Sequence, residues 1–284
     1  MITLSENAYG KDRVRLTKVV RDGATHSILE FTVHIRLQGE FEKVYTEDDN
    51  RYCVPTDTMR NTVYVLARKN TFDSPEEFAR IIADHFVDNF EHIRTCEVRI
   101  EQNIWQRIVV AGKPQEHSFT KERSIRTAFV RREESKAEVR GGIRGLEVLK
   151  STGSYFRDFL RDENTTLPEV DERIMATTVE AEWVYGAGAT DSNGSPFNSA
   201  CERARQIILE VFATHHSPSV QSTMYRTGER LLDAIPHMDS IAMVMPNQHH
   251  ILFDLSPFGL KNDNEIFVGT DAPAGVISAT ISRD

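Results

Sequence analysis

Two kinds of hydrophobic periodicity take turns along this chain, and together they constrain its fold more than any single motif does. Alternation of apolar and polar side chains predicts four strands in the first half, over 13–22, 27–41, 96–109 and 117–131. Helical periodicity between the second and third strands predicts two helices, the first over about 57–69. The second helix opens with Ser74 as cap, Pro75 at the first helical position and Glu77 closing a capping box.

The second half repeats this order of elements without residue-level identity. Its strands are expected over 137–150, 173–186, 237–247 and 248–256, and its helices over 197–214 and 218–235. Strands that flank helix pairs indicate an α+β chain with helices on one face of an antiparallel sheet. We therefore expect two tandem β-β-α-α-β-β units, 1–133 and 134–284. Long strands with exposed edges usually find a partner chain.

Charge and composition exclude several classes of function. The 284 residues carry 34 basic and 43 acidic side chains, a net charge of −9, which argues against nucleic acid as a partner. No segment approaches the roughly 18 to 20 apolar residues of a membrane helix. The cysteines, Cys53, Cys96 and Cys201, form neither a disulfide framework nor a Cys-x-x-Cys pair, so we expect a cytoplasmic protein.

Breaker residues mark two connections. Gly112 and Pro114 flank Lys113 in an expected hairpin turn, and residues 186–194 are expected to form a flexible loop before the third helix. Gly186 and Gly188 follow a strand, but the third glycine of a dinucleotide-binding fingerprint is missing.

The pair Thr56-Asp57 lies where a loop should become a helix. The first backbone N–H groups of a helix have no internal partner and carry the positive end of the macrodipole, so an anionic ligand can dock there. The alternative is that Thr56 and Asp57 are ordinary caps. The fourth helix starts similarly: we interpret Ser217-Pro218 as cap and first helical residue, which puts Val220 and Gln221 in the opening turn, with ordinary helix initiation as the alternative.

Other candidates are unremarkable one by one. Asn247 and His249 share a face of a predicted strand, whereas His250 points away, so a metal site is disfavoured. By itself Lys11 is a solvated lysine, Phe156 a core aromatic and Arg173 a surface ion-pair former.

Together, the order and the local sequences of these segments resemble those of the urate oxidases, the cofactor-free uricase family, over nearly the whole chain. The matching motifs are Tyr9-Gly10-Lys11, Thr56-Asp57-Thr58, Asn61-Thr62-Val63-Tyr64, Leu149-Lys150-Ser151-Thr152, Phe159-Leu160-Arg161-Asp162, Thr165-Thr166-Leu167, Asp171-Glu172-Arg173-Ile174, Val220-Gln221-Ser222-Thr223-Met224-Tyr225 and Pro246-Asn247-Gln248-His249. Two positions depart from the family: Pro55 stands where alanine is common, and Asn164 where tyrosine is.

The resemblance implies a tunnelling fold (T-fold), in which two tandem units per chain join their sheets in a homotetramer to form a multimeric β-barrel tunnel. Active sites would lie between subunits. One subunit would supply Lys11, Thr56 and Asp57, and its neighbour Phe156, Arg173, Val220, Gln221, Asn247 and His249.

The resemblance also implies oxidation of urate by O2 and water to 5-hydroxyisourate and hydrogen peroxide, a step of purine catabolism towards allantoin, without metal, flavin or other cofactor. The implied roles are a Lys11–Thr56–His249 proton relay, stacking on Phe156, hydrogen bonds from Arg173, Gln221 and the N–H groups of Thr56, Asp57 and Val220, and O2 or water held by Thr56 and Asn247. A lysine acts as a base only if its pKa falls well below about 10.4.

Two alternatives stay open at this point. A purine or pterin hydrolase of cyclohydrolase type would share the fold but needs a zinc site, and no Cys-x-x-His spacing supports one. A catalytically inactive tetrameric binding protein would keep the fold alone, which the joint presence of Lys11, Arg173 and Gln221 argues against.

Overall fold

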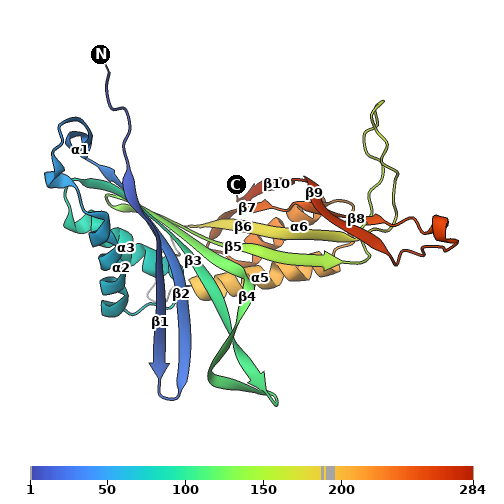
Figure 1. Ribbon diagram of the computed structural model, residues 1–284, viewed down its shortest axis with the longest axis horizontal. Helices are drawn as coiled ribbons and strands as arrows, with labels where there is room; N and C mark the ends of the chain where they lie inside the picture. Colours follow the sequence, from blue (N-terminus) through green and yellow to red (C-terminus); the bar gives the residue numbers. More distant parts are fainter. Residues whose placement is uncertain (1, 187–188, 190–195, 284) are drawn as a thin grey trace. The chain divides into compact units, whose positions relative to one another are not determined.

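Residues 2–186, 189 and 196–283 are described by the computed structural model of this chain (Figure 1). The chain divides into two compact units, the first made of 1–143 with 183–201 and the second of 144–182 with 202–284. The tandem repeats 1–133 and 134–284 stay a prediction. Most of the loop predicted over 186–194 lies outside the described residues.

The four strands predicted in the first half are confirmed; three are longer than their periodic segments, and β2 has the predicted length but begins and ends two residues earlier. They are β1 (Tyr9–Asp22), β2 (Thr25–Gly39), β3 (Ile93–Val110) and β4 (Lys113–Glu133). Neighbours in this order pair antiparallel. The predicted β3–β4 turn is tight, because Ala111 and Gly112 both have positive φ, 49° and 76°.

Both predicted helices of the first unit are present, together with two short ones that periodicity does not reveal. In chain order they are α1 (Glu42–Thr46), the 3₁₀ helix η1 (Asn50–Tyr52), α2 (Thr56–Lys69) and α3 (Pro75–Asn89). Helix α3 packs on β3 and β4, whereas α2 lies along β1. Phe31 of β2 and Phe78 of α3 stack with ring centroids 5.9 Å apart, so alternation on the strand and periodicity on the helix meet in one core.

The start of α3 follows the capping pattern predicted from sequence. The Glu77 N–H donates to Ser74 Oγ at 3.3 Å, and Pro75 occupies the first turn. Glu77 Oε2 reaches back to the N–H of Asp73, one residue before the cap, at 3.1 Å. Both ends of the box are therefore satisfied, with the second bond displaced by one residue.

The second half contains the predicted elements and two further strands. The helices are α5 (Phe197–Thr214), α6 (Val220–Ala234) and the 3₁₀ helix η2 (Ser256–Phe258). The strands are β5 (Lys136–Lys150), β6 (Met175–Tyr185), β7 (Met238–Val244), β8 (Asn247–Leu252), β9 (Phe267–Gly275) and β10 (Ser278–Ser282). The antiparallel α+β class is confirmed.

The two additional strands change the partners of the last predicted pair. Strand β7 pairs with β10, and β8 pairs with β9 and, through the single bridge Ala176↔Gln248, with β6. Helix α6 packs on β7 and β10. The segments that follow α6 therefore bring β8 next to the beginning of β6, where several candidate residues lie.

A buried ion pair joins α3 to β4 in the first unit. Arg126 Nη2 donates to Glu76 Oε2 at 2.6 Å, and Arg126 Nη1 donates to Asn198 Oδ1 of α5 at 2.5 Å. Both charged side chains are buried. Burial raises the pKa of the Glu76 carboxyl, and the charge of Arg126 opposes this shift. The helical face predicted from apolar spacing does not reveal this pair.

Gly141 of β5 lies against the same pair and leaves room for it. A Cβ at this position would lie 2.7 Å from Trp183 Nε1, 2.8 Å from Glu76 Oε1 and 2.9 Å from Tyr185 Oη. Glycine therefore lets three polar side chains approach one strand.

We expect Arg126→Met to lower the free energy of unfolding by about 3–5 kcal/mol, because it leaves Glu76 as a buried carboxylate without its partner. Arg51→Met is the control, since the Arg51–Asp49 pair, at 2.6 Å, is solvent-exposed on the arginine side, and its loss should be barely measurable. Urea unfolding followed by circular dichroism measures both. Equal losses in the two variants would contradict the assignment.

Candidate active site

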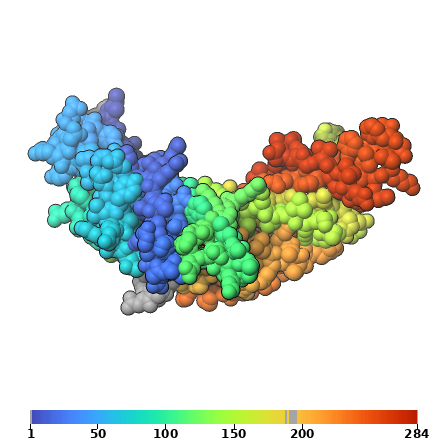
Figure 2. Space-filling view, turned by 60° about the horizontal axis from the view of Figure 1, so that its bottom comes forward, coloured from blue at the N-terminus to red at the C-terminus, as the bar shows by residue number. Residues whose placement is uncertain are grey.

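Helix α2 runs alongside β1, so that its first turn lies near the beginning of the strand (Figures 1 and 2). Three hydrogen bonds set this alignment: the Val54 N–H to Tyr9 Oη at 2.8 Å, Tyr64 Oη to the Arg15 carbonyl at 3.1 Å, and Lys18 Nζ to the Asn70 carbonyl at 2.8 Å. The contacts advance together along both elements, so the start of the helix is level with residues 9–11.

Lys11 is half-buried and lies on the same face of β1 as Tyr9, because side chains two residues apart in a strand share a face. The β1–β2 register is regular up to Lys11 and is interrupted after it, where Arg13 has a φ of 54°. At Gly10 a Cβ would lie 1.8 Å from the Ile35 carbonyl oxygen, so only glycine fits beside Lys11. Lys11 thus lies on the face of β1 that carries Tyr9, whose hydroxyl bonds to the segment before the helix.

Thr56 is the first residue of α2, and neither Thr56 nor Asp57 caps the helix. The N-cap is Pro55, which makes no side-chain cap bond, and the first helical bond runs from the Met59 N–H to the Pro55 carbonyl at 3.1 Å. The capping alternative is therefore wrong. The exposed first turn presents backbone N–H groups that a ligand can use.

The carboxylate of Asp57 is engaged within its own helix. Arg60 Nη2 lies 2.7 Å from Asp57 Oδ1, and Asn61 Nδ2 donates to Asp57 Oδ2 at 2.9 Å. Asp57 therefore offers a ligand its backbone N–H rather than its side chain. Among the described residues Lys11 Nζ makes no hydrogen bond to Thr56, so the relay stays a prediction.

In the second unit, Ser154 holds Arg173 just before β6. The Arg173 backbone N–H donates to the Ser154 carbonyl at 2.9 Å, and Arg173 Nε donates to Ser154 Oγ at 3.2 Å. The guanidinium carbon lies 5.2 Å from the centroid of the Phe156 ring. These contacts leave the two terminal guanidinium nitrogens available for a ligand.

Arg173 is a half-buried cation for which the described part of the chain provides no carboxylate partner. Burial lowers the pKa of its guanidinium, but the ordinary value is so high that the group stays charged at neutral pH. Burial, and then the charge of Arg173, lower the pKa of the Lys150 amino group. This corner of the second unit is therefore electropositive and favours an anion.

The ring of Phe156 already has an aromatic neighbour. Phe159 stacks on it with centroids 4.9 Å apart and an interplanar angle of 11°. Backbone hydrogen bonds between Phe156 and Val170, at 2.9 and 3.1 Å, hold the segment. Phe156 thus has both an aromatic ring and a guanidinium as neighbours.

Helix α6 starts two residues later than predicted. Its N-cap is Ser219, whose Oγ accepts from the Ser222 N–H at 3.1 Å, and the assignment of Ser217-Pro218 as cap and first helical residue is wrong. Ser217 instead bridges backbones, since its carbonyl accepts from the Tyr155 N–H at 2.9 Å. Val220 and Gln221 nevertheless occupy the opening turn, with the N–H of Val220 at the first helical position.

Asn247 and His249 both belong to β8, but the pairing of β8 with β9 is irregular between them, so their common side stays a prediction. Between them, Gln248 Nε2 donates to Thr178 Oγ1 of β6 at 2.9 Å. Asn247 is opposite Gly275 in β9, and the exposed His249 is opposite Thr270.

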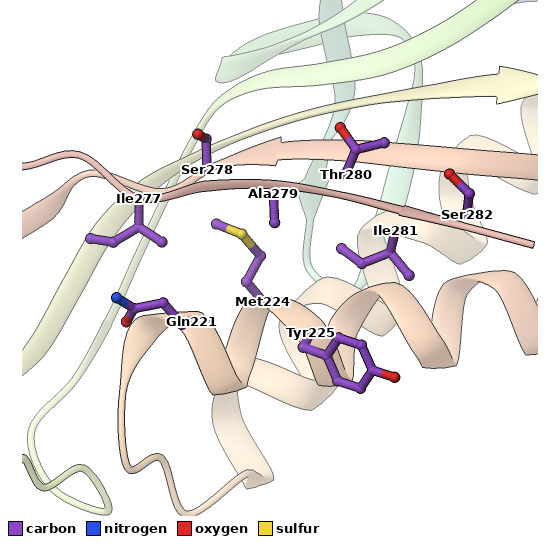
Figure 3. Close-up of a pocket in the computed structure, with 9 residues that line it drawn as sticks. All are labelled: Gln221, Met224, Tyr225, Ile277, Ser278, Ala279, Thr280, Ile281 and Ser282. Atoms are coloured by element: carbon purple, nitrogen blue, oxygen red, sulfur yellow. The ribbon is translucent and has the colours of Figure 1, made fainter.

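A groove of about 420 Å³ lies between strand β10 and the first turns of helix α6 (Figure 3). Gln221 and Ile277 lie at one end of it, and Tyr225 and Ile281 lie further along. The Ile277 carbonyl accepts from the Met245 N–H at 2.8 Å, two residues before Asn247. The end of the groove at Gln221 is therefore bonded to the segment just before β8.

Among the six predicted residues of the second unit, Phe156 and Arg173 are in direct contact. Pairs formed by their chain neighbours relate the other segments: Ala176↔Gln248 joins β6 to β8, the Met245–Ile277 bond joins the segment before β8 to the groove beside Gln221, and the Tyr155–Ser217 bond joins the segment of Phe156 to the one before α6. Lys11, Thr56 and Asp57 lie in the first unit.

Three supporting residues are absent from the sequence-based set. Ser154 and Ser217 are fully buried and hold Arg173 and the segment before α6, and Ile277 lines the groove beside Gln221. The only available signal for Ser154 is its position two residues after the motif Leu149-Lys150-Ser151-Thr152. Within the described residues, no three His, Cys, Asp or Glu side chains gather where they could hold a metal ion. No described helix is long and apolar enough to cross a membrane.

Comparison with known proteins decides the family. The family model described as Uricase matches residues 7–131 and 139–278. The chain belongs to the uricase family. The uricase of Arthrobacter globiformis is 41% identical, with 100% of this chain and 91% of that protein covered. The uricase of Emericella nidulans is 40% identical, with 100% and 98% covered.

Solved uricases also share the fold. The crystal structure of the Arthrobacter globiformis uricase has a TM-score of 0.92 and 40% identity, with 100% of this chain and 96% of that chain covered. A uricase structure from Bacillus fastidious, at 23% identity, has a TM-score of 0.84 and supports the fold alone. The predicted T-fold is confirmed.

Proposed function

We propose that this chain is a urate oxidase, which converts urate, O2 and water into 5-hydroxyisourate and hydrogen peroxide. The observation that carries the proposal is the half-buried Arg173 held beside Phe156, without a carboxylate partner among the described residues, in a chain that matches uricases along its whole length. An anionic ligand would neutralise the uncompensated charge of Arg173. A flat purine ring could stack on the ring of Phe156. Neither a hydrolase of cyclohydrolase type nor an inactive binding protein has comparable support.

The proposed binding mode uses groups of complementary chemistry. Arg173 donates two parallel hydrogen bonds to a carbonyl and an anionic nitrogen of urate, and the amide of Gln221 offers a donor and an acceptor to the opposite edge. Phe156 supplies the stacking face. Backbone N–H groups of Thr56, Asp57 and Val220 hold the remaining acceptors.

The proposed chemistry moves two electrons from urate to O2. Urate loses two electrons, the hydroxyl of the attacking water is added at C5, and O2 takes up two electrons and two protons to leave as hydrogen peroxide. Lys11, through Thr56 and with His249, accepts and returns the protons. Thr56 and Asn247 hold first O2 and then water above the ring. In this proposal the protein contributes binding, orientation and proton transfer, and no metal or flavin takes part.

We further propose a homotetramer with active sites at subunit interfaces. Lys11, Thr56 and Asp57 belong to the first unit, and the six residues around Arg173 belong to the second. In this proposal one subunit contributes the first group and its neighbour contributes the second. The cytoplasmic location likewise stays a prediction.

The decisive assay mixes metal-stripped protein with urate under air. The expected result is loss of urate absorbance with one hydrogen peroxide formed for each urate consumed. A zinc-dependent hydrolase would need metal restored and would form no peroxide, and an inactive binding protein would leave urate unchanged. Either of those results would overturn the proposed function.

We expect Arg173→Ala to weaken binding of urate and of 8-azaxanthine-like analogues about 10- to 100-fold, because charge-assisted hydrogen bonds contribute about 1.5–3 kcal/mol. Arg157→Ala is the matched control: Arg157 lies on the same segment but forms an exposed ion pair with Asp171 at 2.8 Å. Isothermal titration with the analogue measures both. Unchanged affinity in the Arg173 variant would remove this residue from the site.

For Lys11→Met we expect turnover to fall at least 100-fold while affinity for the analogue changes little, because a proton-transfer group contributes typically 10²–10⁴-fold to rate. The exposed Lys113, substituted in the same way at the β3–β4 hairpin, should keep wild-type turnover. Steady-state kinetics together with analogue titration separate the two effects. Near-normal turnover of the Lys11 variant would refute the relay.

A further inference from the structure

The start of α2 is held by a residue outside the proposed catalytic set. We propose that Tyr9 is a positioning residue, whose hydroxyl sets the first turn of α2 against Lys11 for catalysis. The inference rests on the proposed function, because it assigns a task to the geometry of Lys11 and Thr56. It adds Tyr9 to the residues on which turnover depends.

The hydroxyl of Tyr9 occupies a fixed place. Its ring packs edge-on against Phe41, with centroids 4.8 Å apart and an interplanar angle of 84°, and Phe41 is fully buried. Tyr9 Oη accepts a hydrogen bond from the Val54 N–H at 2.8 Å. The strand and the segment that leads into α2 are thereby joined at one point.

This bond is the last backbone anchor before the helix. Pro55 has no N–H, so the nearest upstream donor is that of Val54. Pro55 is the N-cap of α2 and makes no side-chain hydrogen bond. Its ring fixes φ, here at −56°, so the backbone direction at Val54 determines where the first turn begins. Any shift of Val54 therefore moves Thr56.

The same residue is also tied to Lys11. Tyr9 and Lys11 share a face of β1, and the strand is regular between them, with Tyr9 opposite Leu37 and Lys11 opposite Ile35. One side chain thus connects the strand that carries Lys11 with the helix start that carries Thr56. Proton transfer needs these groups within hydrogen-bond reach, and a misplacement of about 1 Å can lower a rate about 100-fold.

Burial raises the pKa of the Tyr9 phenol, the neighbouring Cys53 raises it further, and the Val54 hydrogen bond opposes the shift. The phenol is therefore neutral at physiological pH. The bond from Val54 is an ordinary neutral hydrogen bond, which phenylalanine at this position removes without deleting a charge.

The test is Tyr9→Phe, which keeps the ring on Phe41 and removes the acceptor. We expect kcat to fall at least 10-fold, while affinity for an 8-azaxanthine-like analogue stays within about 3-fold, because Arg173 dominates binding. Amide exchange at Val54 should speed up. The melting temperature should change by no more than it does in the control variant.

The matched control is Tyr64→Phe. Tyr64 also joins this helix to this strand through a phenol hydroxyl, here as the donor from its Oη to the Arg15 carbonyl at 3.1 Å, but it lies two turns from the helix start. Its kcat should stay within about 2-fold of wild type. Equal loss of kcat in both variants, or wild-type kcat in Tyr9→Phe, would overturn the positioning role. A wild-type chain that does not oxidise urate would instead overturn the proposed function.

Discussion

The unpaired charge of Arg173 is the constraint around which the second unit is organised. Ser154 and Phe156 hold the guanidinium in a half-buried position, where burial disfavours its charge and no described carboxylate offsets it. Keeping a cation there reduces stability unless an anion binds. The β6–β8 bridge and the start of α6 place further polar groups around the same corner, so that the unfavourable charge lies where binding can relieve it.

The helix starts differ in how they are held. The first turns of α3 and α6 are capped by Ser74 and Ser219, whereas α2 begins after Pro55 with no side-chain cap. The cap of α6 takes up the Ser222 N–H and leaves that of Val220, whereas the uncapped start of α2 gives up no donor to a cap side chain. Helix α2 is therefore kept in place by a contact from β1, through Tyr9, rather than by a cap of its own.

Hydrophobic periodicity predicted the strands and helices that are long and have one buried face. Strands β1 to β4 follow from alternation, and the start of α3 follows from Ser74 and its capping box. Strands β9 and β10 escaped prediction because one carries Gly and Pro, the other is five residues long, and both are largely exposed. Ser217-Pro218 matched a helix-start pattern, but the backbone of Ser217 is used to pair with a distant segment.

Periodicity in the sequence predicts even less of the candidate site than of the fold. Residue spacing predicts Asn247 and His249 on one face, yet only the fold brings Gln248 to Ala176 and hence β8 to Arg173. Family resemblance could nominate the residues, because it compares whole motifs, but it does not explain what holds them. The supporting contacts include the buried hydroxyl of Ser154, whose partner Arg173 is 19 residues away, and the backbone of the buried Ser217, which pairs with the distant Ser154 and Tyr155. Hydrophobic periodicity does not reveal where a single serine becomes buried. The residues that position a site are therefore the ones that periodicity predicts least.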